Sequence, residues 1–133
     1  MNFEIEFYET ENGREPAKEF ILSLEPKMQA KMLHEIDLLK ENGIFLREPH
    51  TKMIEKGIYE IRAKQGSNIS RVLYFFTIGQ RIILTNGFIK KTQKTPKRYI
   101  NYAKQCKKDY EARHTMKKEE ILWAVMMILE ISY

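Results

Sequence analysis

The sequence predicts an α+β domain, with a small antiparallel sheet, two N-terminal helices on one face of it and a C-terminal helix. Two observations support this fold class. Near the N-terminus, an alternating apolar segment precedes two segments with helical apolar spacing. The middle of the chain holds several segments rich in β-branched and aromatic residues, joined by short glycine-containing links. The length of 133 residues favours one domain.

The first part of the chain predicts one strand and two helices. Residues 2–8 alternate between polar and apolar side chains, which is typical of a half-buried strand. Pro16 and Pro26 each suit the first turn of a helix. The second helix ends at Asn42-Gly43 and carries an apolar stripe that is expected to face the core. The stripe consists of Met28, Met32, Ile36 and Leu39.

The middle of the chain predicts a meander of strands followed by a helix. A short strand is expected near 52–54, and further strands at 57–63, 69–78 and 81–89. Thr95 then suits a helix N-cap, with Pro96 at the first helical position. Without the short strand, the predicted order is β-α-α-β-β-β-α, with the helices mainly on one face of the sheet.

Charge is distributed unevenly along the chain. The formal net charge is +5, yet residues 1–26 hold seven acidic and two basic residues, a net of −5. Residues 87–114 hold nine basic and two acidic residues, a net of +7. The positive part of the molecule is therefore expected to attract a polyanion, although a solvated basic helix has the same composition.

Several classes of protein and site are disfavoured. Cys106 is the only cysteine, so no intramolecular disulfide forms, and the histidines show no metal-ligand spacing. The acidic, alternating N-terminus does not resemble a signal peptide. The apolar run 121–129 is too short to span a bilayer. Residues 115–133 are expected to form an apolar helical extension that caps the domain or pairs with another chain.

Two arginines are expected to face each other across a hairpin. A turn about Gly66-Ser67 places Arg62 and Arg71 directly opposite one another, with their side chains on the same face. Like charges so placed repel unless an anion or carboxylate lies between them. Glu60 points to the same face, so one interpretation is a surface Glu–Arg network. The other is a phosphate clamp on the open face of the sheet.

Basic residues gather where the last strand ends and the helix begins. Lys90, Lys91 and Lys94 follow the strand, and Lys97 and Arg98 fall in the first helical turn. Cations at a helix start oppose the macrodipole, whereas a bound phosphate is favoured there. Nearby tyrosines are either core residues or stacking surfaces for bases. They are Tyr59, Tyr74, Tyr99 and Tyr102.

Three quoted stretches are specific enough to compare with a known family. They read EPHTKMIEKGIYEIR, SRVLYFF and IILTNGFIKKTQKTPKRYINYAKQCKKDY. In this order and spacing they resemble the RelE/HigB-like toxin family of type II toxin–antitoxin systems, specifically its phage-derived branch. The resemblance runs from Phe3 to about Arg113. It implies a RelE-like toxin domain over 1–114, followed by the extension 115–133.

The resemblance also implies a RelE/ParE-like fold, in which a concave basic face is left for RNA, and a set of site residues. Arg62, Arg71 and Lys91, or its neighbour Lys90, match the family's basic residues, and Glu60 or Glu48 is the expected base. The C-terminal tyrosine or histidine of many ribonuclease members has no counterpart here. The residues expected to bind RNA are Lys52, Lys90, Lys94, Lys97 and Arg98.

On this basis the sequence predicts a cytoplasmic toxin that cuts mRNA on the ribosome, as a metal-independent endoribonuclease without a cofactor. Relatives of the ParE branch poison DNA gyrase, so a gyrase-directed toxin is an alternative. An inactive binding module derived from a toxin is another. The expected partners are mRNA, the ribosome and an antitoxin with a helix-turn-helix domain. The oligomeric state does not follow from the sequence.

Overall fold

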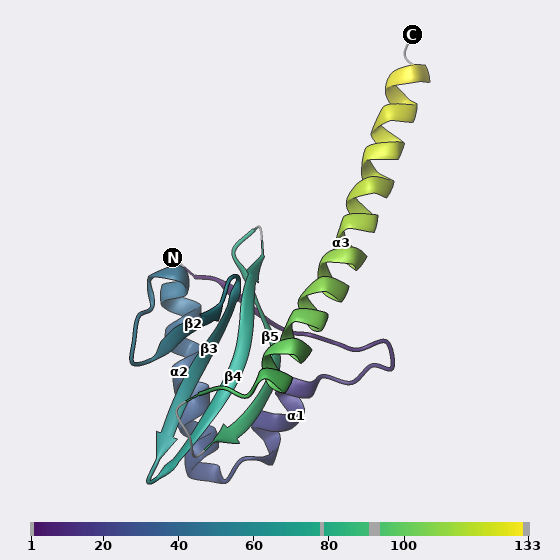
Figure 1. The fold of residues 1–133 in the computed structure, drawn as a ribbon. Coiled ribbons are helices and arrows are strands. Elements are labelled where there is room, and N and C mark those ends of the chain that lie inside the picture. The colour runs from purple at the N-terminus through teal and green to yellow at the C-terminus, as the bar shows by residue number, and fades with distance from the viewer. Residues whose placement is uncertain (1, 78, 91–93, 132–133) are drawn as a thin grey trace.

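The computed structural model describes residues 2–77, 79–90 and 94–131, of which 115–120 and 131 are described by their backbone alone. The helices and strands follow the predicted order with two additions, a strand at the place of the short one expected near 52–54 and one short 3-10 turn (Figure 1). They are β1 (Glu4–Phe7), α1 (Pro16–Ser23), α2 (Pro26–Asn42), η1 (Gly43–Phe45), β2 (Thr51–Glu55), β3 (Ile58–Gln65), β4 (Asn68–Thr77), β5 (Arg81–Lys90) and α3 (Lys97–Ile131).

The sheet is mixed, in the order β1-β5-β4-β3-β2. Strands β2 to β5 form the antiparallel meander that the sequence predicts. Strand β1 differs, because it pairs in parallel with β5, whereas an antiparallel sheet was expected. The reason is connectivity. Two helices follow β1 and carry the chain across one face to the opposite edge at β2, so the meander returns to β1 with β5 running in its direction.

Helices cover both faces of the sheet, which corrects the expectation that they lie mainly on one face. Helices α1 and α2 pack on one face, where Met32 and Leu39 belong to the same buried cluster as Val72 and Tyr74 of β4. Helix α3 packs on the other face through Ala103, Cys106 and Tyr110. Strand β4 is apolar on both sides, since Leu73 and Phe75 alternate with Val72 and Tyr74, and both sides are therefore buried.

Polar contacts fasten α3 to the N-terminal strand. The hydroxyl of Tyr8 donates to Asp109 at 2.6 Å, and that of Tyr110 donates to Glu6 at 2.7 Å. Arg113 donates to the backbone carbonyl of Glu9 at 2.8 Å and also pairs with Asp109. These contacts hold the N-terminal half of α3 on the sheet.

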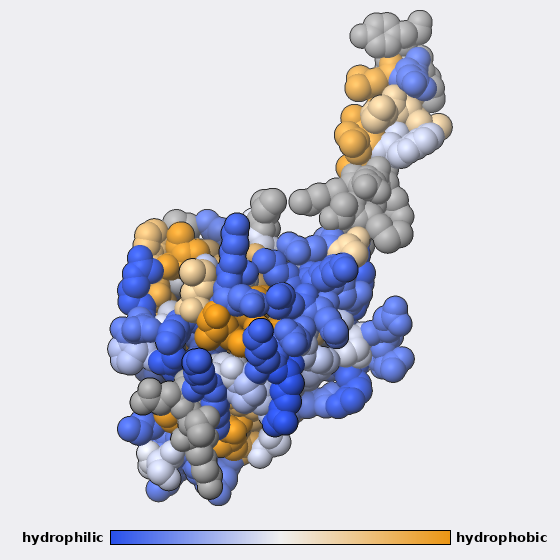
Figure 2. Space-filling view, viewed as in Figure 1, coloured by the Kyte–Doolittle hydropathy of each residue, from blue (hydrophilic) through white to orange (hydrophobic). Residues whose placement is uncertain are grey.

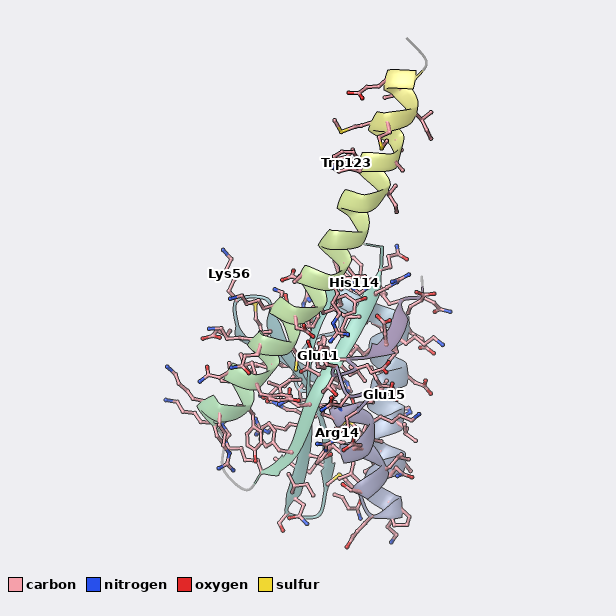
Figure 3. All side chains as sticks on the ribbon, turned by 90° about the vertical axis from the view of Figure 1, so that its right-hand side faces the viewer. Glu11, Arg14, Glu15, Lys56, His114 and Trp123 are labelled. Atoms are coloured by element: carbon pink, nitrogen blue, oxygen red, sulfur yellow. The ribbon has the colours of Figure 1, made fainter. Side chains whose placement is uncertain are left out.

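Beyond His114, α3 continues away from the domain as the same helix (Figures 1 and 3). The division into a domain over 1–114 and a helical extension over 115–133 stays a prediction; α3, a helix of 35 residues, runs through position 114 without a break. Its far end, residues 121–130, is exposed. Among the described residues, no helix is long and apolar enough to cross a membrane.

Candidate nucleic-acid interface

The hairpin β3–β4 sets the register of the candidate site. Arg62 pairs directly with Arg71, as the turn about Gly66-Ser67 predicted. Lys52 of β2 pairs with Glu60 of β3, so Lys52, Glu60, Arg62 and Arg71 all point to one face. This is the face that α3 partly covers, since Leu73 and Phe75 lie on it and pack against α3.

Glu60 lies at the centre of this group and is fully buried. Its Oε1 accepts a hydrogen bond from Nη1 of Arg71 at 2.8 Å, and two from Arg62, at 3.1 Å from Nε and 3.0 Å from Nη2. Arg71 is buried as well, whereas the Arg62 side chain is 24 % exposed. The network is therefore a buried one with Arg62 at its mouth, and differs from the exposed Glu–Arg network considered above.

Thr95 completes the coordination of Glu60 from the segment before α3. Its hydroxyl donates to Oε2 of Glu60 at 2.8 Å. We expected Thr95 to cap the helix, with Pro96 in its first turn, but the helix begins at Lys97 and the hydroxyl points to the sheet. The contact links the basic segment 94–98 to the two arginines of the hairpin.

A bulge aims Lys90 at the same site. The pairing of β4 with β5 shifts between Leu73 and Tyr74, so that Leu84 and Asn86 both pair and Thr85 is left over. The hydroxyl of Thr85 lies 3.2 Å from the Leu73 carbonyl. One extra residue reverses which side chains face each side of the sheet. As a result Lys90 turns towards Arg71, while Ile89 is exposed.

Lys90 is a buried cation in a positively charged setting. Only 7 % of the residue is exposed, and among the described residues its Nζ has no hydrogen-bond partner. Burial lowers the pKa of Lys90, and the charge of Arg71 lowers it further, against the opposing effect of Glu60. Three cations, those of Arg62, Arg71 and Lys90, thus surround one carboxylate, and the surplus positive charge favours an anion.

A hollow of about 330 Å³ opens onto this group between β2, β3 and the start of α3. Glu60, Arg62 and Thr95 lie in its wall, with the apolar side chains of Met53, Ile54 and Ile100. Three exposed lysines complete the lining, and all three were predicted to bind RNA. They are Lys52, Lys94 and Lys97. The hollow therefore combines a polar, cationic wall with an apolar one, a combination that suits a phosphate and its attached sugar or base.

Three of the basic residues further along α3 have structural partners. Lys104 pairs with Glu55 at 3.2 Å, and the Lys107 ammonium lies 5.9 Å from the centre of the Phe75 ring. Arg113 fastens the helix to the N-terminal strand. Of the described basic residues in 87–114, Lys94 and Lys97 line the hollow and Lys90 lies beneath it, turned towards Arg71.

The tyrosines divide between core and rim. Tyr74 is buried and stacks with Tyr59 on the opposite face, which argues against Tyr74 as a base-stacking residue. Tyr99 stacks on Phe88 with ring centres 4.0 Å apart. The guanidinium of Arg98 lies over the Tyr99 ring, with its central carbon 4.8 Å from the ring centre. Tyr99 and Arg98 thus form an aromatic and cationic border beside the basic segment.

Among the described residues that were predicted to act in catalysis, Glu48 is the one that lies apart from Glu60. Glu48 is exposed and lines a different pocket, of about 400 Å³, whose walls include Tyr59, Tyr74 and Phe76. Lys52 borders both pockets. Lys91 lies outside the described residues, so its position stays a prediction.

Comparison with known proteins identifies the family. Residues 19–108, more than half of the chain, match the phage-derived Gp49-like proteins (DUF891). The chain belongs to this family. Gp49-like proteins are associated with toxin–antitoxin systems and the RelE-like toxin fold, and the arrangement of sheet and helices here agrees with that fold. Membership is consistent with a toxin and suggests an antitoxin as partner. A comparison with curated proteins gives no match.

The matched region includes the whole candidate site of this Gp49-like protein and ends before the exposed part of α3. Sequence reasoning missed two features of the site, the hydroxyl of Thr95 on Glu60 and the burial of Lys90. The Thr-Asn-Gly at 85–87 was the available signal for the second, because glycine and asparagine within a strand often mark a bulge.

Proposed function

We propose that this Gp49-like protein is the toxin of a type II toxin–antitoxin system and cuts mRNA on the ribosome. The observation that supports this most directly is the convergence of Arg62, Arg71 and Lys90 around one carboxylate. Such a site is suited to the extra negative charge that a phosphodiester acquires during cleavage.

In the proposed reaction the RNA supplies its own nucleophile. The ribose 2′-oxygen attacks the adjacent phosphorus, and the bond from phosphorus to the 5′-oxygen of the next nucleotide breaks. The products are a 2′,3′-cyclic phosphate and a free 5′-hydroxyl. One proton leaves the 2′-hydroxyl and one reaches the departing oxygen, so the overall charge is conserved.

The basic residues act at different depths of the proposed site. Arg62, at the mouth of the buried network, contacts the phosphate, while Arg71 and Lys90 act from below. Lys91 is proposed to join them, on the family resemblance. The exposed cations at the rim bind flanking phosphates and set the register of the strand. These are Lys52, Lys94, Lys97 and Arg98.

The general base is assigned to Glu60, with Glu48 as the alternative. Oε1 of Glu60 is occupied by both arginines, so Oε2 is the oxygen available for proton transfer. Thr95 now donates its hydroxyl to that oxygen, in the manner expected of a ribose 2′-hydroxyl. Binding of the RNA then requires the hydrogen bond between the Thr95 hydroxyl and Oε2 of Glu60 to break. Glu48 is exposed but reaches the RNA only from the neighbouring pocket.

Cleavage of mRNA in a purified translation reaction tests the proposal. The 5′ ends that appear are mapped for the wild-type protein, for Arg62→Gln and for Arg71→Ala. Arg14→Gln is the matched control, since Arg14 is exposed and its partner is Glu19 on α1, outside the hollow. We expect cleavage by the wild type and the control, and at least about a tenfold loss in both site variants. Equal cleavage by a folded Arg71→Ala protein contradicts the site.

The translation reaction, combined with induction of the protein in growing cells, separates the two other functions that the sequence left open. A gyrase-directed toxin leaves mRNA intact and causes DNA damage in growing cells. An inactive module does neither, and its induction leaves growth unchanged. The proposed antitoxin, a helix-turn-helix protein encoded next to this gene, is expected to restore growth when the two are produced together.

A further inference from the structure

The far end of α3 exposes a continuous set of large apolar side chains. Eight of them lie between residues 121 and 129. Since successive residues of a helix are about 100° apart, nine consecutive residues pass every side of the helix. The set therefore surrounds the helix and forms no single stripe. Figure 2 shows hydrophobic residues at this end, apart from the largely hydrophilic domain. The residues are Ile121, Leu122, Trp123, Val125, Met126, Met127, Ile128 and Leu129.

This tip, residues 121–131, lies further along α3 than Arg113, which holds the helix to the domain by donating to the backbone carbonyl of Glu9. His114, next in the chain, contacts its own helix, since its ring Nδ1 lies 2.8 Å from the carbonyl of Tyr110. The tip continues a helix that is already formed on the domain, so it needs no separate nucleation. Most helical stability in proteins comes from tertiary packing, so contact of these exposed apolar side chains with another surface would stabilise the tip.

The exposed area is sufficient for a stable contact. Each of the eight side chains is roughly half to two thirds exposed, so the tip presents an apolar area on the order of 800 Å², which is what one partner contributes to a standard interface. Scattered apolar residues on a surface need no explanation, but a contiguous set of this size marks an interaction site.

The charge of the tip indicates which partner covers it. Glu130 is the only charged residue in 121–131, so the tip offers no attraction to a polyanion. The whole chain has a net charge of +5, and the basic hollow lies at the other end of α3. Two copies that meet through their tips bury apolar surface against apolar surface and keep their basic domains apart. Contact through the domains would bring like charges together.

We propose that α3 is a self-association element, and that the tips of two or more copies of this chain pack against one another. A closed assembly of identical chains is the common form for soluble oligomers, and a helix that is apolar on all sides has surface for more than one neighbouring helix. This inference is independent of the proposed ribonuclease activity, because no residue of the hollow takes part in it.

The chain contains one tryptophan, Trp123, and it lies in the tip, so its fluorescence reports on this surface alone. We expect the emission of the full-length protein to shift to the blue as concentration rises, and its mass by light scattering to exceed the 15.9 kDa of one chain at least twofold. A protein that stays at 15.9 kDa at the highest concentration reached, with solvent-exposed tryptophan emission, overturns the proposal.

A pair of variants separates the tip from the rest of the surface. Leu122→Glu combined with Leu129→Glu places two charges about two turns apart on one side of the tip, and is expected to return both mass and emission to those of the single chain. Leu22→Glu is the control, because Leu22 on α1 is as exposed as Trp123, at 67 %. Association that survives in the tip variant, or that is lost in Leu22→Glu, contradicts the assignment. Undiminished mRNA cleavage by the tip variant would keep the two proposals distinct.

Discussion

Arg62 and Arg71 lie directly opposite each other on β3 and β4, and both donate hydrogen bonds to the same oxygen of Glu60. Two cations held this close would repel without the carboxylate. Because Glu60 is fully buried, its charge and those of the arginines depend on one another. The pair therefore couples the stability of the hairpin to the electrostatics of the proposed cleavage site.

The first prediction concerns this buried network. Glu60→Leu leaves Arg71 buried without the carboxylate, and we expect the free energy of unfolding to fall by about 3–5 kcal/mol. Adding Arg71→Met removes the buried positive charge of the guanidinium, so the double variant is expected to recover much of that loss. Urea denaturation of the two single variants and the double variant measures the coupling.

The control for this set of three variants is the exposed ion pair between Arg14, which precedes α1, and Glu19, which lies on α1. Their side chains are 2.7 Å apart. Removing either partner there is expected to leave the urea midpoint unchanged, because solvent screens exposed pairs. Additive effects of Glu60→Leu and Arg71→Met would show that the two side chains do not depend on each other.

The arginine pair could be predicted from the sequence, because a two-residue turn at Gly66-Ser67 sets the register of β3 against β4. The alternating and helically spaced segments likewise predicted the strands and the α-helices of the domain, but not the short 3-10 helix η1. Local patterns carry this information, since periodicity and turn residues act over a few positions. The parallel pairing of β1 did not follow, because it depends on where the long connection through α1 and α2 returns.

The depth of the site could not be predicted for a similar reason. Strict alternation along β5 from Ile83, which faces α3, would put Ile89 on the α3 face and Lys90 on the other. The bulge at Thr85 reverses this. Whether an extra residue is accommodated there depends on packing against β4 and α3. The contact of Thr95 with Glu60 likewise depends on how the segment before α3 crosses the sheet.

The second prediction concerns Lys90. The pKa of Lys90 is lower in the folded state than in the unfolded state. At a pH between these two pKa values the unfolded state binds more protons, so the free energy of unfolding rises with pH. Below the folded value the full penalty for burying the charge applies. Lys90→Met should therefore stabilise the protein at neutral pH, by about 1 kcal/mol.

That gain should shrink as the pH rises through the folded pKa of Lys90 towards its unfolded value. Parallel urea titrations of wild type and Lys90→Met across neutral and alkaline pH measure the difference. The same variant is expected to bind RNA more weakly, so that stability and function move in opposite directions. A Lys90→Met protein that is less stable at neutral pH would show that the ammonium is satisfied in the folded state.

The third prediction concerns the packing of α1 on β5. A Cβ added at Gly87 would lie 2.2 Å from Cδ2 of Phe20, closer than atoms can approach. Gly87→Ala is therefore expected to displace the ring and to lower the free energy of unfolding by about 1–3 kcal/mol. Gly66→Asn is the comparison, because its Cβ meets nothing within 4 Å and asparagine tolerates a φ of +62°. Thermal unfolding should separate the two variants clearly, and equal midpoints would contradict the close approach.

The fourth prediction concerns the docking of α3 in acid. Hydrogen bonds from Arg113 and from Tyr8 lower the pKa of Asp109 below its ordinary value. A carboxyl whose folded pKa is depressed stabilises the fold above its unfolded pKa, of about 3.9, and loses that contribution as the pH falls through the folded value. We therefore expect Asp109→Asn to be less stable than wild type near neutral pH, by a few tenths of a kcal/mol to about 1 kcal/mol, since the carboxylate is partly exposed. The gap should close as the pH falls below about 4.

Denaturant titrations of wild type and Asp109→Asn at a series of pH values measure this gap. Asp37→Asn is the control, because Asp37 lies in α2 on the other face of the sheet. A gap that persists unchanged in acid would mean that the asparagine disturbs the helix by its shape and not by its charge.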